Sequence, residues 1–263
     1  MSVLLLRLAG PLQSWGSAAR FARRSTENAP TKSGVMGLLA ASLGRARDAD
    51  LSDLTELRFG VRIDQPGSRL RDFQTAHHAA SGRAMPISER FYLADAVFLA
   101  GVEGEARLLH QVYAALLEPR FLPYLGRRSC PPSQPIDMGP PHEASLEDAL
   151  RNAKWQASPW YMQQVDRTAR ASSVTATDTL DLLIDCPPSE TPDISLRDNP
   201  VSFDPRHRQY KLRGVRGTQT AVPRQLPLPS HDPTGALTPL PSGSAATAHP
   251  RINPPRDTPP RTT

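Results

Sequence analysis

The composition of the chain changes abruptly after Arg216. From Gly217 to Thr263 there is no Phe, Trp or Tyr, and proline recurs throughout. Such a segment cannot bury enough apolar surface to offset the conformational entropy lost on ordering. We therefore expect residues 217–263 to form a disordered tail, with a proline-rich ligand for an adaptor groove as the alternative. The folded part is then residues 1–216, which fits one large domain or two small ones.

The apolar segments and the cysteine content exclude several classes of protein. No run of about 18 apolar residues is present, so the sequence excludes a membrane span. The apolar run near the N-terminus is short and lacks flanking basic residues, which argues against a signal peptide. Cys130 and Cys186 are too few for a disulfide framework or for a zinc site with four cysteine ligands. We expect a protein of the reducing cytoplasm that holds no cofactor and no metal.

Arginine supplies nearly all of the basic charge. The net charge is +5, and only three of the 31 basic residues, Lys32, Lys154 and Lys211, are lysines. A GC-rich genome is the simple explanation of this bias. The planar guanidinium also donates two parallel hydrogen bonds to a phosphate, so the composition permits a nucleic-acid partner.

The hydrophobic pattern predicts strands and helices in alternation. Strands are expected at Ser2–Leu8, 59–63, 69–75 and Phe91–Val102, and helices at 31–45, 52–57, Glu105–Leu117 and Ser145–Asn152. This order needs one more strand to complete a βαββαβ ferredoxin-like module. Either Gln134–Met138 or Thr179–Cys186 can supply it, and the pattern does not decide between them. Residues 203–216 predict a final basic strand pair, or a strand and a loop.

Two basic motifs are candidates for phosphate binding. Lys32 and Ser33 lie at a predicted helix start, where free backbone amides suit one phosphate, although helix capping by Thr31 or Ser33 is the alternative. The glycines of a P-loop are absent before Lys32. After the next long helix, Gly126 permits a tight turn and two arginines follow it, which suits successive phosphates. A solvated basic loop is the alternative there.

The histidines and tryptophans allow two further hypotheses. His77 and His78 could supply acid–base chemistry for RNA cleavage, but nothing nearby in the sequence orients them, which favours a flexible loop. Trp15, Trp155 and Trp160 could stack on bases, with a core or interface position as the alternative. The aromatic string of a standard RRM is missing, so an RRM-like fold here would not bind RNA on the usual stacking platform.

Four sequence strings together resemble a known family. They are RLAGPLQSWG, PTKSGVMGLLAASLG, LRDFQTAHH and RFLPYLGRRSCP, in this order along the chain. They resemble the CasD subunit family of the type I-E CRISPR surveillance complex, Cascade. The resemblance extends from Ser2 to about Arg216, and the strings GPLQSWG and PYLGRRSCP are its most specific part.

The resemblance implies an α+β, ferredoxin-like (RRM-type) domain with a small C-terminal β extension. It implies a hairpin thumb at about Asp72–Arg90 that folds over RNA against a backbone subunit. Members of the family cap the 5′ handle of CRISPR RNA and contact the large subunit, and target DNA is reached only through the complex. A separate subunit cleaves the precursor RNA, so the resemblance implies a non-catalytic role. The alternatives are a metal-independent endoribonuclease, as in relatives of another subtype, and a purely structural adaptor.

The motifs and the resemblance together give a set of expected RNA-binding residues and no catalytic or metal-binding residue. The set is Gln13, Trp15, Lys32, Ser33, Arg71, Gln74, His78, Arg127, Arg128 and Ser129. For Gln13 and Trp15, the alternative is that they pin the first loop to the core.

Overall fold

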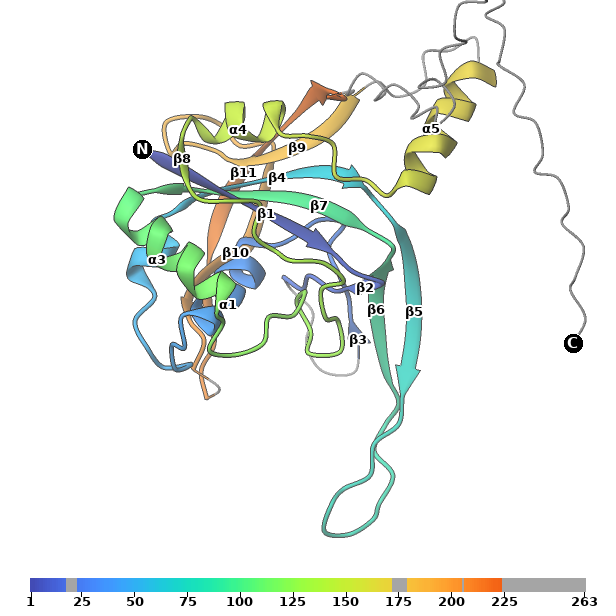
Figure 1. Ribbon diagram of the computed structural model, residues 1–263. Coiled ribbons are helices and arrows are strands. Elements are labelled where there is room, and N and C mark those ends of the chain that lie inside the picture. The colour runs from blue at the N-terminus through green and yellow to red at the C-terminus, as the bar shows by residue number, and fades with distance from the viewer. Residues whose placement is uncertain (18–22, 172–178, 205, 224–263) are drawn as a thin grey trace, which may run out of the picture. The chain divides into compact units, whose positions relative to one another are not determined.

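The computed structural model describes residues 1–17, 23–171, 179–204 and 206–223 (Figure 1). These residues belong to one compact unit, Met1–Arg224. The second unit, Gln225–Thr263, lies outside the described residues, and most of the expected tail lies there with it.

Of the two sheets in the described residues, the larger has seven strands. Its strand order is β10-β11-β9-β4-β7-β1-β8, and each neighbouring pair is antiparallel. The strands are β1 (Ser2–Ala9), β4 (Arg58–Gln65), β7 (Val97–Gly104), β8 (His142–Glu143), β9 (Thr179–Asp185), β10 (Ile194–Ser202) and β11 (Gln209–Ala221). The molecule is therefore a mixed α/β structure built on a large antiparallel sheet.

Helices cover both faces of this sheet. Helices α1 (Lys32–Ser42) and α3 (Ala106–Leu117) pack on one face with Leu4, Leu6 and Leu8 of β1, and the short α2 (Ser52–Thr55) lies beside α1. Helix α4 (Leu146–Asn152) packs on the other face with Val3. Strand β1 is thus buried on both faces, as its continuous apolar run predicts.

Both candidates for the missing strand lie beside the predicted module, but on opposite sides of it. Thr179–Asp185 forms β9 next to β4. Residues 134–138 run along β1 with one isolated bridge, Leu6 to Asp137, and only the two-residue β8 pairs regularly with that edge. Of the two alternatives, Thr179–Cys186 contains a regular strand and Gln134–Met138 does not.

The C-terminal strands differ from the prediction in extent. Strand β11 is one long strand. It pairs with β10, a strand that the sequence pattern did not predict. It continues to Ala221, which pairs with Thr179 of β9. The expected end of the folded part, at Arg216, therefore falls inside a strand.

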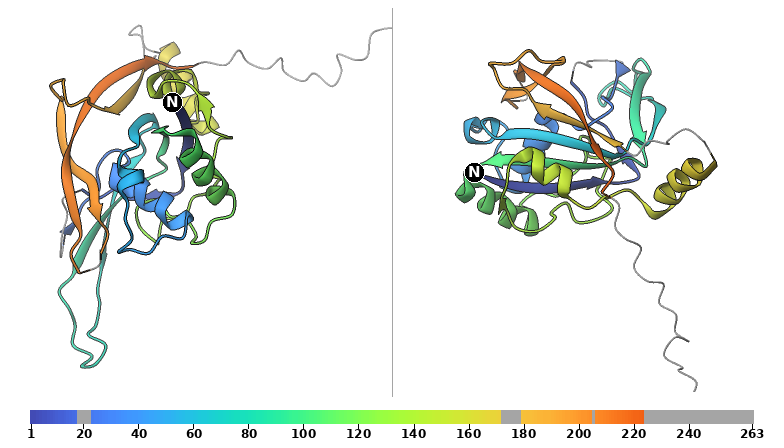
Figure 2. Two further views of the ribbon diagram at one scale, coloured as in Figure 1. Left: turned by 90° about the vertical axis from the view of Figure 1, so that its left-hand side faces the viewer. Right: turned by 90° about the horizontal axis from the view of Figure 1, so that it is seen from above.

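The second sheet is smaller and carries a protruding hairpin. It contains β2 (Leu12–Gln13), β3 (Arg23–Arg24), β5 (Ser68–Gln74) and β6 (Ser88–Ala94). Strands β5 and β6 pair along their whole length, and the hairpin tip extends away from both sheets (Figures 1 and 2). We call residues 68–94 the thumb hairpin.

Two further elements differ from the prediction. The expected strand Phe91–Val102 is two strands, β6 and β7, because Asp95 adopts a φ of 55° and turns the chain between the sheets. Helix α5 (Pro159–Ala171) was not predicted, and it contains Trp160, which is 54% exposed.

Candidate nucleic-acid interface

The loop after α3 turns at Gly126 and lies directly against the first loop of the chain. Gly126 has a φ of +83°, and a Cβ atom there would stand 1.8 Å from the carbonyl oxygen of Ser14. The Ser14 N–H donates to the carbonyl of Leu125 at 3.1 Å. Only glycine combines this backbone conformation with this close approach. We call residues 125–130 the arginine loop.

The arginine loop is held at both ends by its own backbone. Leu125 N–H donates to the carbonyl of Cys130 (2.7 Å), and Cys130 N–H donates to the carbonyl of Arg127 (2.9 Å). Leu125 and Cys130 are fully buried, and this burial raises the pKa of the Cys130 thiol despite its contact with Ser129. The thiol is therefore a neutral core group, and the loop presents its middle residues from a fixed base.

Arg127 connects the arginine loop to the thumb hairpin. Its guanidinium carbon lies 4.8 Å from the ring centroid of Tyr92 on β6, and Nη2 donates to the carbonyl of Arg24 on β3 at 2.9 Å. Arg128 and Ser129 are exposed beside it. The two adjacent arginines therefore have different surroundings: the side chain of Arg127 contacts the thumb hairpin, and that of Arg128 is exposed to solvent.

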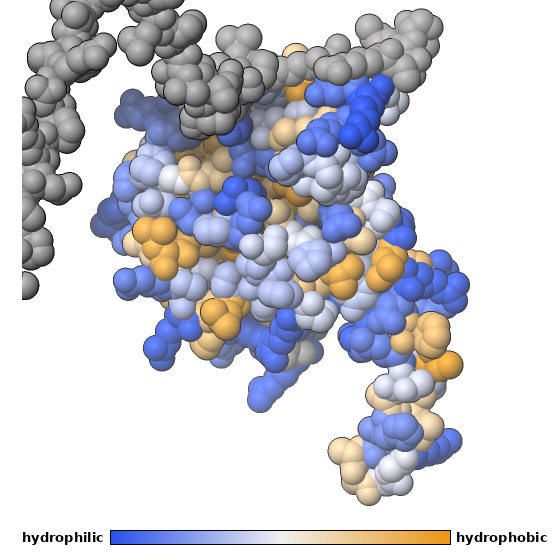
Figure 3. Space-filling view, turned by 45° about the vertical axis from the view of Figure 1, so that its right-hand side comes forward, coloured by the Kyte–Doolittle hydropathy of each residue, from blue (hydrophilic) through white to orange (hydrophobic). Residues whose placement is uncertain are grey.

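A cluster of arginines surrounds the base of the thumb hairpin. Its members come from β3, β5, β6 and the arginine loop, and are Arg23, Arg24, Arg69, Arg71, Arg90 and Arg127. Glu89 pairs with Arg71 and lies 3.9 Å from Arg23. Figure 3 shows hydrophilic and hydrophobic surface alternating along the hairpin. The base of the hairpin is thus a basic surface, in which Arg23 and Arg127 lie over the rings of Phe91 and Tyr92.

Gln13 and Trp15, two of the expected RNA-binding residues, are fully buried. Gln13 Nε2 donates to the carbonyls of Leu8 (2.9 Å) and Ala96 (2.7 Å), and its Oε1 accepts from Trp15 Nε1 (3.0 Å). A Cβ atom on Gly34 would stand 2.7 Å from the Trp15 ring. These contacts give both residues the pinning role that the sequence left open, and neither lines a surface groove.

Lys32 and Ser33 do not form a phosphate site, because two carboxylates of the protein already accept the hydrogen bonds of Lys32 that a bound phosphate would accept. The Lys32 backbone N–H donates to Asp198 (2.8 Å) and its Nζ donates to Asp185 (3.0 Å). Ser33 is buried, and the side chain of Thr31 accepts from Gly34 N–H (3.3 Å) as a helix cap. The capping alternative with Thr31 is therefore the correct one.

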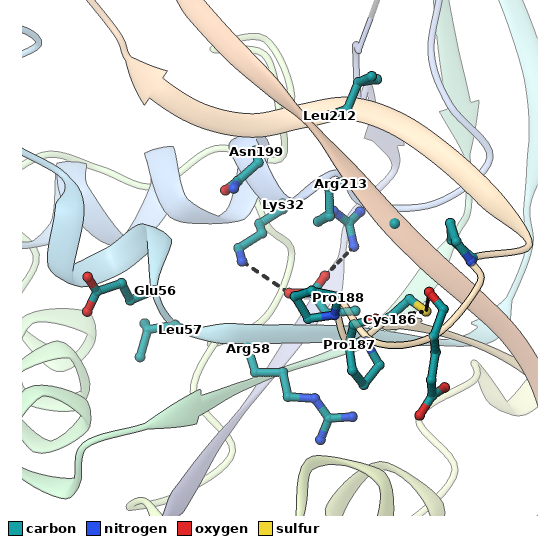
Figure 4. Close-up of a pocket in the computed structure, with 14 residues that line it drawn as sticks. Lys32, Glu56, Leu57, Arg58, Cys186, Pro187, Pro188, Asn199, Leu212 and Arg213 are labelled. Atoms are coloured by element: carbon teal, nitrogen blue, oxygen red, sulfur yellow. Dashed lines mark hydrogen bonds and ion pairs between the residues drawn. The ribbon is translucent and has the colours of Figure 1, made fainter.

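Arg213 completes this buried ionic network. Its guanidinium donates to Asp185 (2.6 Å) and Asp198 (2.8 Å), and although burial disfavours its charge, these carboxylates raise its pKa. In Figure 4, the dashed lines from Lys32 and Arg213 meet at the carboxylate of Asp185. A cavity of about 780 Å³ opens beside the network. Its charged lining residues balance, with Lys32, Arg58 and Arg213 against Glu56, Asp185 and Glu190. The cavity has no excess of positive charge for a phosphate.

The remaining expected residues lie along the thumb hairpin and do not converge. Arg71 is exposed and ion-paired with Glu89, and Gln74 Nε2 donates to Asp72 at 3.4 Å. His78 lies at the tip, where Nδ1 is 3.2 Å from Ser81 Oγ. Within the described residues no cluster of three His, Cys, Asp or Glu side chains could hold a metal ion, and none of the described helices is long and apolar enough to cross a membrane.

Sequence reasoning missed two residues of this surface, Arg90 and Tyr92. Both lie on β6, and their spacing of two places them on one face of the strand. That period was visible in the sequence. The contact of Tyr92 with a loop more than thirty residues later was not, because it depends on Gly126 and on the turn at Asp95.

Comparisons with known proteins agree on one group of relatives. A family model described as CRISPR-associated protein (Cas_Cas5) matches residues 3–216. The chain is 37% identical over 171 residues to the CRISPR system Cascade subunit CasD of Escherichia coli, a match that covers 57% of this chain and 76% of that protein.

Two solved structures are also similar to this chain. One is described as a crystal structure of Cas protein; it superposes with a TM-score of 0.63 at 37% identity and covers 83% of this chain and 95% of its own. The other is a chain of a CRISPR RNA-guided surveillance complex, with a TM-score of 0.67 at 32% identity, covering 89% and 97%.

Proposed function

Because the chain belongs to the CRISPR-associated protein (Cas_Cas5) family, we propose that it is a non-catalytic subunit of a type I-E CRISPR surveillance complex. In this role it binds and caps the 5′ handle of CRISPR RNA and anchors the neighbouring backbone and large subunits. The complex then presents the guide for pairing with target DNA, so base pairing reads the target sequence. Cys130 and Cys186 are both free, which fits a reducing cytoplasm.

The observation that carries this proposal is the placement of Arg127. A rigid loop holds its guanidinium over Tyr92, inside a cluster of arginines at the base of a protruding hairpin. Arginines on a fixed framework suit a phosphate backbone, and exposed aromatic or guanidinium planes suit unstacked bases. The arrangement can hold single-stranded RNA without reading most of its sequence.

The strand order supports a ferredoxin-like domain as the framework. Strands β8, β1, β7 and β4 are neighbours in this order, with α1 after β1 and α3 after β7, as a βαββαβ module requires. Helix α4 buries Leu146 and Leu150 against the sheet face opposite α1 and α3. Bases cannot stack on the part of the sheet that α4 covers, and this favours the hairpin and the arginine loop as the surface for RNA.

The geometry around His78 favours a non-catalytic subunit over the endoribonuclease alternative. The imidazole lies at the exposed hairpin tip beside Ser81, away from the arginine cluster at the hairpin base. A general base needs a fixed position near the 2′-hydroxyl that it activates. Incubation of the purified protein with repeat RNA, with and without divalent metal, should leave the RNA intact. Site-specific cleavage that disappears in His78→Ala would contradict the proposal.

RNA binding itself is tested with a handle RNA oligonucleotide over a salt series. The affinity should fall steeply with salt, because phosphate contacts release counterions. A purely structural adaptor would show no specific binding at any salt concentration.

A further inference from the structure

Arg90 and Tyr92 share one face of β6 with Arg127 and Arg24. Arg24 is the Cα partner of Arg90 in the neighbouring strand, so the two side chains lie on the same face of the sheet. Arg127 lies over Tyr92 and donates to the carbonyl of Arg24. Along the strand, Arg90 and Tyr92 are separated by roughly 6.6 Å. The guanidinium of Arg127 is therefore held next to the position of Arg90.

Arg90 and Arg127 each carry a donor without an acceptor. Arg90 Nε and Arg127 Nη1 are buried and make no hydrogen bond to any described residue. Buried donors in folded proteins are almost always bonded, and an arginine keeps its charge at every physiological pH. Two unfilled donors on one face are available to an acceptor from another molecule.

The charge on this face also lacks a matching acid. Asp72 is the cross-strand partner of Arg90, and its carboxylate accepts from Gln74 at 3.4 Å. Among the described residues, neither Arg90 nor Arg127 forms an ion pair on this face. On the opposite face of the hairpin, Glu89 lies within ion-pair distance of both Arg23 and Arg71. The charges of Arg90 and Arg127 therefore lie on the face of the hairpin that is poorer in acidic partners.

We propose that Arg90 and Arg127 form a clamp for the phosphates of single-stranded RNA, with Tyr92 as the shared support. This inference rests on the proposed function, because its ligand is the RNA proposed above. Both donors are buried in the free chain, so each side chain must rotate to bring its donor to a phosphate oxygen, whose geometry the planar guanidinium matches. Arg90, rather than Arg128, is then the second arginine of the site, and the RNA runs along this face of the hairpin.

The test measures the affinity of full-length variants for a handle RNA oligonucleotide over a salt series. Arg90→Ala should weaken binding about tenfold, because a hydrogen bond to a charged group is lost. The slope of log affinity against log salt should flatten by about one unit for each phosphate contact removed. Arg128→Ala should weaken binding less than Arg90→Ala. Arg107→Ala removes the same charge from an exposed position on α3 and should leave the affinity within about threefold.

A double-mutant cycle gives a second readout. The losses in Arg90→Ala and Arg127→Ala should not add, because both side chains grip one segment of backbone. Arg90→Gln keeps most of the side chain and should lose affinity like Arg90→Ala, while the melting temperature of both stays near that of the wild type.

Two results distinguish a failure of the clamp from a failure of the proposed function. If the wild type binds handle RNA and Arg90→Ala binds it equally well, the clamp is wrong and the proposed function stands. If the wild type itself does not bind, both are wrong.

Discussion

The carbonyl oxygen of Ser14 occupies the space in which a Cβ atom of Gly126 would lie. This contact joins the two sequence strings that are most specific to the family, one near the N-terminus and one after α3. The buried pair Gln13 and Trp15 holds the first loop in place, and the arginine loop rests on it. The position of Arg127 at the thumb hairpin is a consequence of this contact.

Gly126→Ala should therefore destabilise the protein and weaken RNA binding. The positive φ alone costs about 1–2 kcal/mol for a residue with a Cβ, and the clash with Ser14 adds to it. Gly82→Ala is the matched control, since Gly82 also has a positive φ (64°) but nothing lies within 4 Å of its Cβ position. Urea unfolding measures the free energy of unfolding of both variants. Equal losses of stability in the two variants would show that the contact with Ser14 adds nothing to the cost of Gly126→Ala.

Arg62→Ala should be among the most damaging substitutions in the chain. Arg62 and Asp64 form a fully buried ion pair (2.6 Å), and Arg62 also donates to the carbonyls of Leu150, Ala153 and Lys154. Removing one partner of a buried pair costs about 3–5 kcal/mol, because the other charge is left uncompensated.

A partly exposed ion pair is the control for this prediction. Arg45 pairs with Asp53, with 24% and 41% of the two side chains exposed, so Arg45→Ala should cost less than about 1 kcal/mol. Chemical unfolding compares the two variants. A cost for Arg62→Ala near that of Arg45→Ala would contradict the role of the buried pair, which holds the end of α4 and the segment leading to α5.

Low pH should weaken the ion pair between Glu147 of α4 and Arg58 of β4. Hydrogen bonding from Arg58 lowers the pKa of Glu147 below its ordinary value, and the nearby charge of Arg216 acts in the same direction. A carboxyl with a lowered pKa in the folded state stabilises the fold above its unfolded-state pKa, about 4.3, and this stabilisation is lost as the pH falls through the folded pKa.

Melting temperatures of the wild type and Glu147→Gln between pH 7 and pH 3 measure this effect. The wild type should be the more stable at pH 7, and the difference should shrink as the pH falls below about 4. A difference that stays constant over the range would rule out a contribution from Glu147 ionisation.

The position of a C-terminal truncation should decide its effect. Truncation after Pro223 keeps β11 whole, and we predict that residues beyond it are dispensable for folding and RNA capture, because they lack aromatic residues and are rich in proline. Truncation after Gly217 removes Thr218–Ala221, which pair with β9, and should lower the melting temperature by several degrees. Equal melting temperatures for the two truncations would mean that this end of β11 adds nothing.

The tip of the thumb hairpin should serve assembly rather than folding. Residues 76–84 are exposed, and the hydrogen bonds of the tip stay within the hairpin, as from His78 N–H to the carbonyl of Arg83 (2.9 Å). Replacing Ala76–Ala84 with a short glycine–serine linker should leave the melting temperature unchanged and impair joining to the adjacent backbone subunit. Co-purification with that subunit at the wild-type yield would refute this role.

Local patterns predicted most of the elements, and long-range contacts explain what they missed. The apolar run of Ser2–Leu8 and the stripe of Glu105–Leu117 gave β1 and α3 almost to the residue, because burial alone determines them. Lys32 was misassigned because its partners, Asp185 and Asp198, lie more than 150 residues away in the sequence. Arg127 was proposed as an RNA-binding residue from the glycine before it, whereas the proposal for Arg90 required the register of β6 against β3 and β5.

Sequencing the 5′ ends of the RNA that co-purifies with the tagged chain and its partner subunits tests whether this chain caps the 5′ handle of CRISPR RNA within a surveillance complex. We expect one uniform, repeat-derived 5′ end in the wild-type complex, and a loss of that RNA when Arg90 and Arg127 are both replaced by alanine. Heterogeneous 5′ ends without repeat sequence, or no RNA at all in an assembled complex, would contradict it.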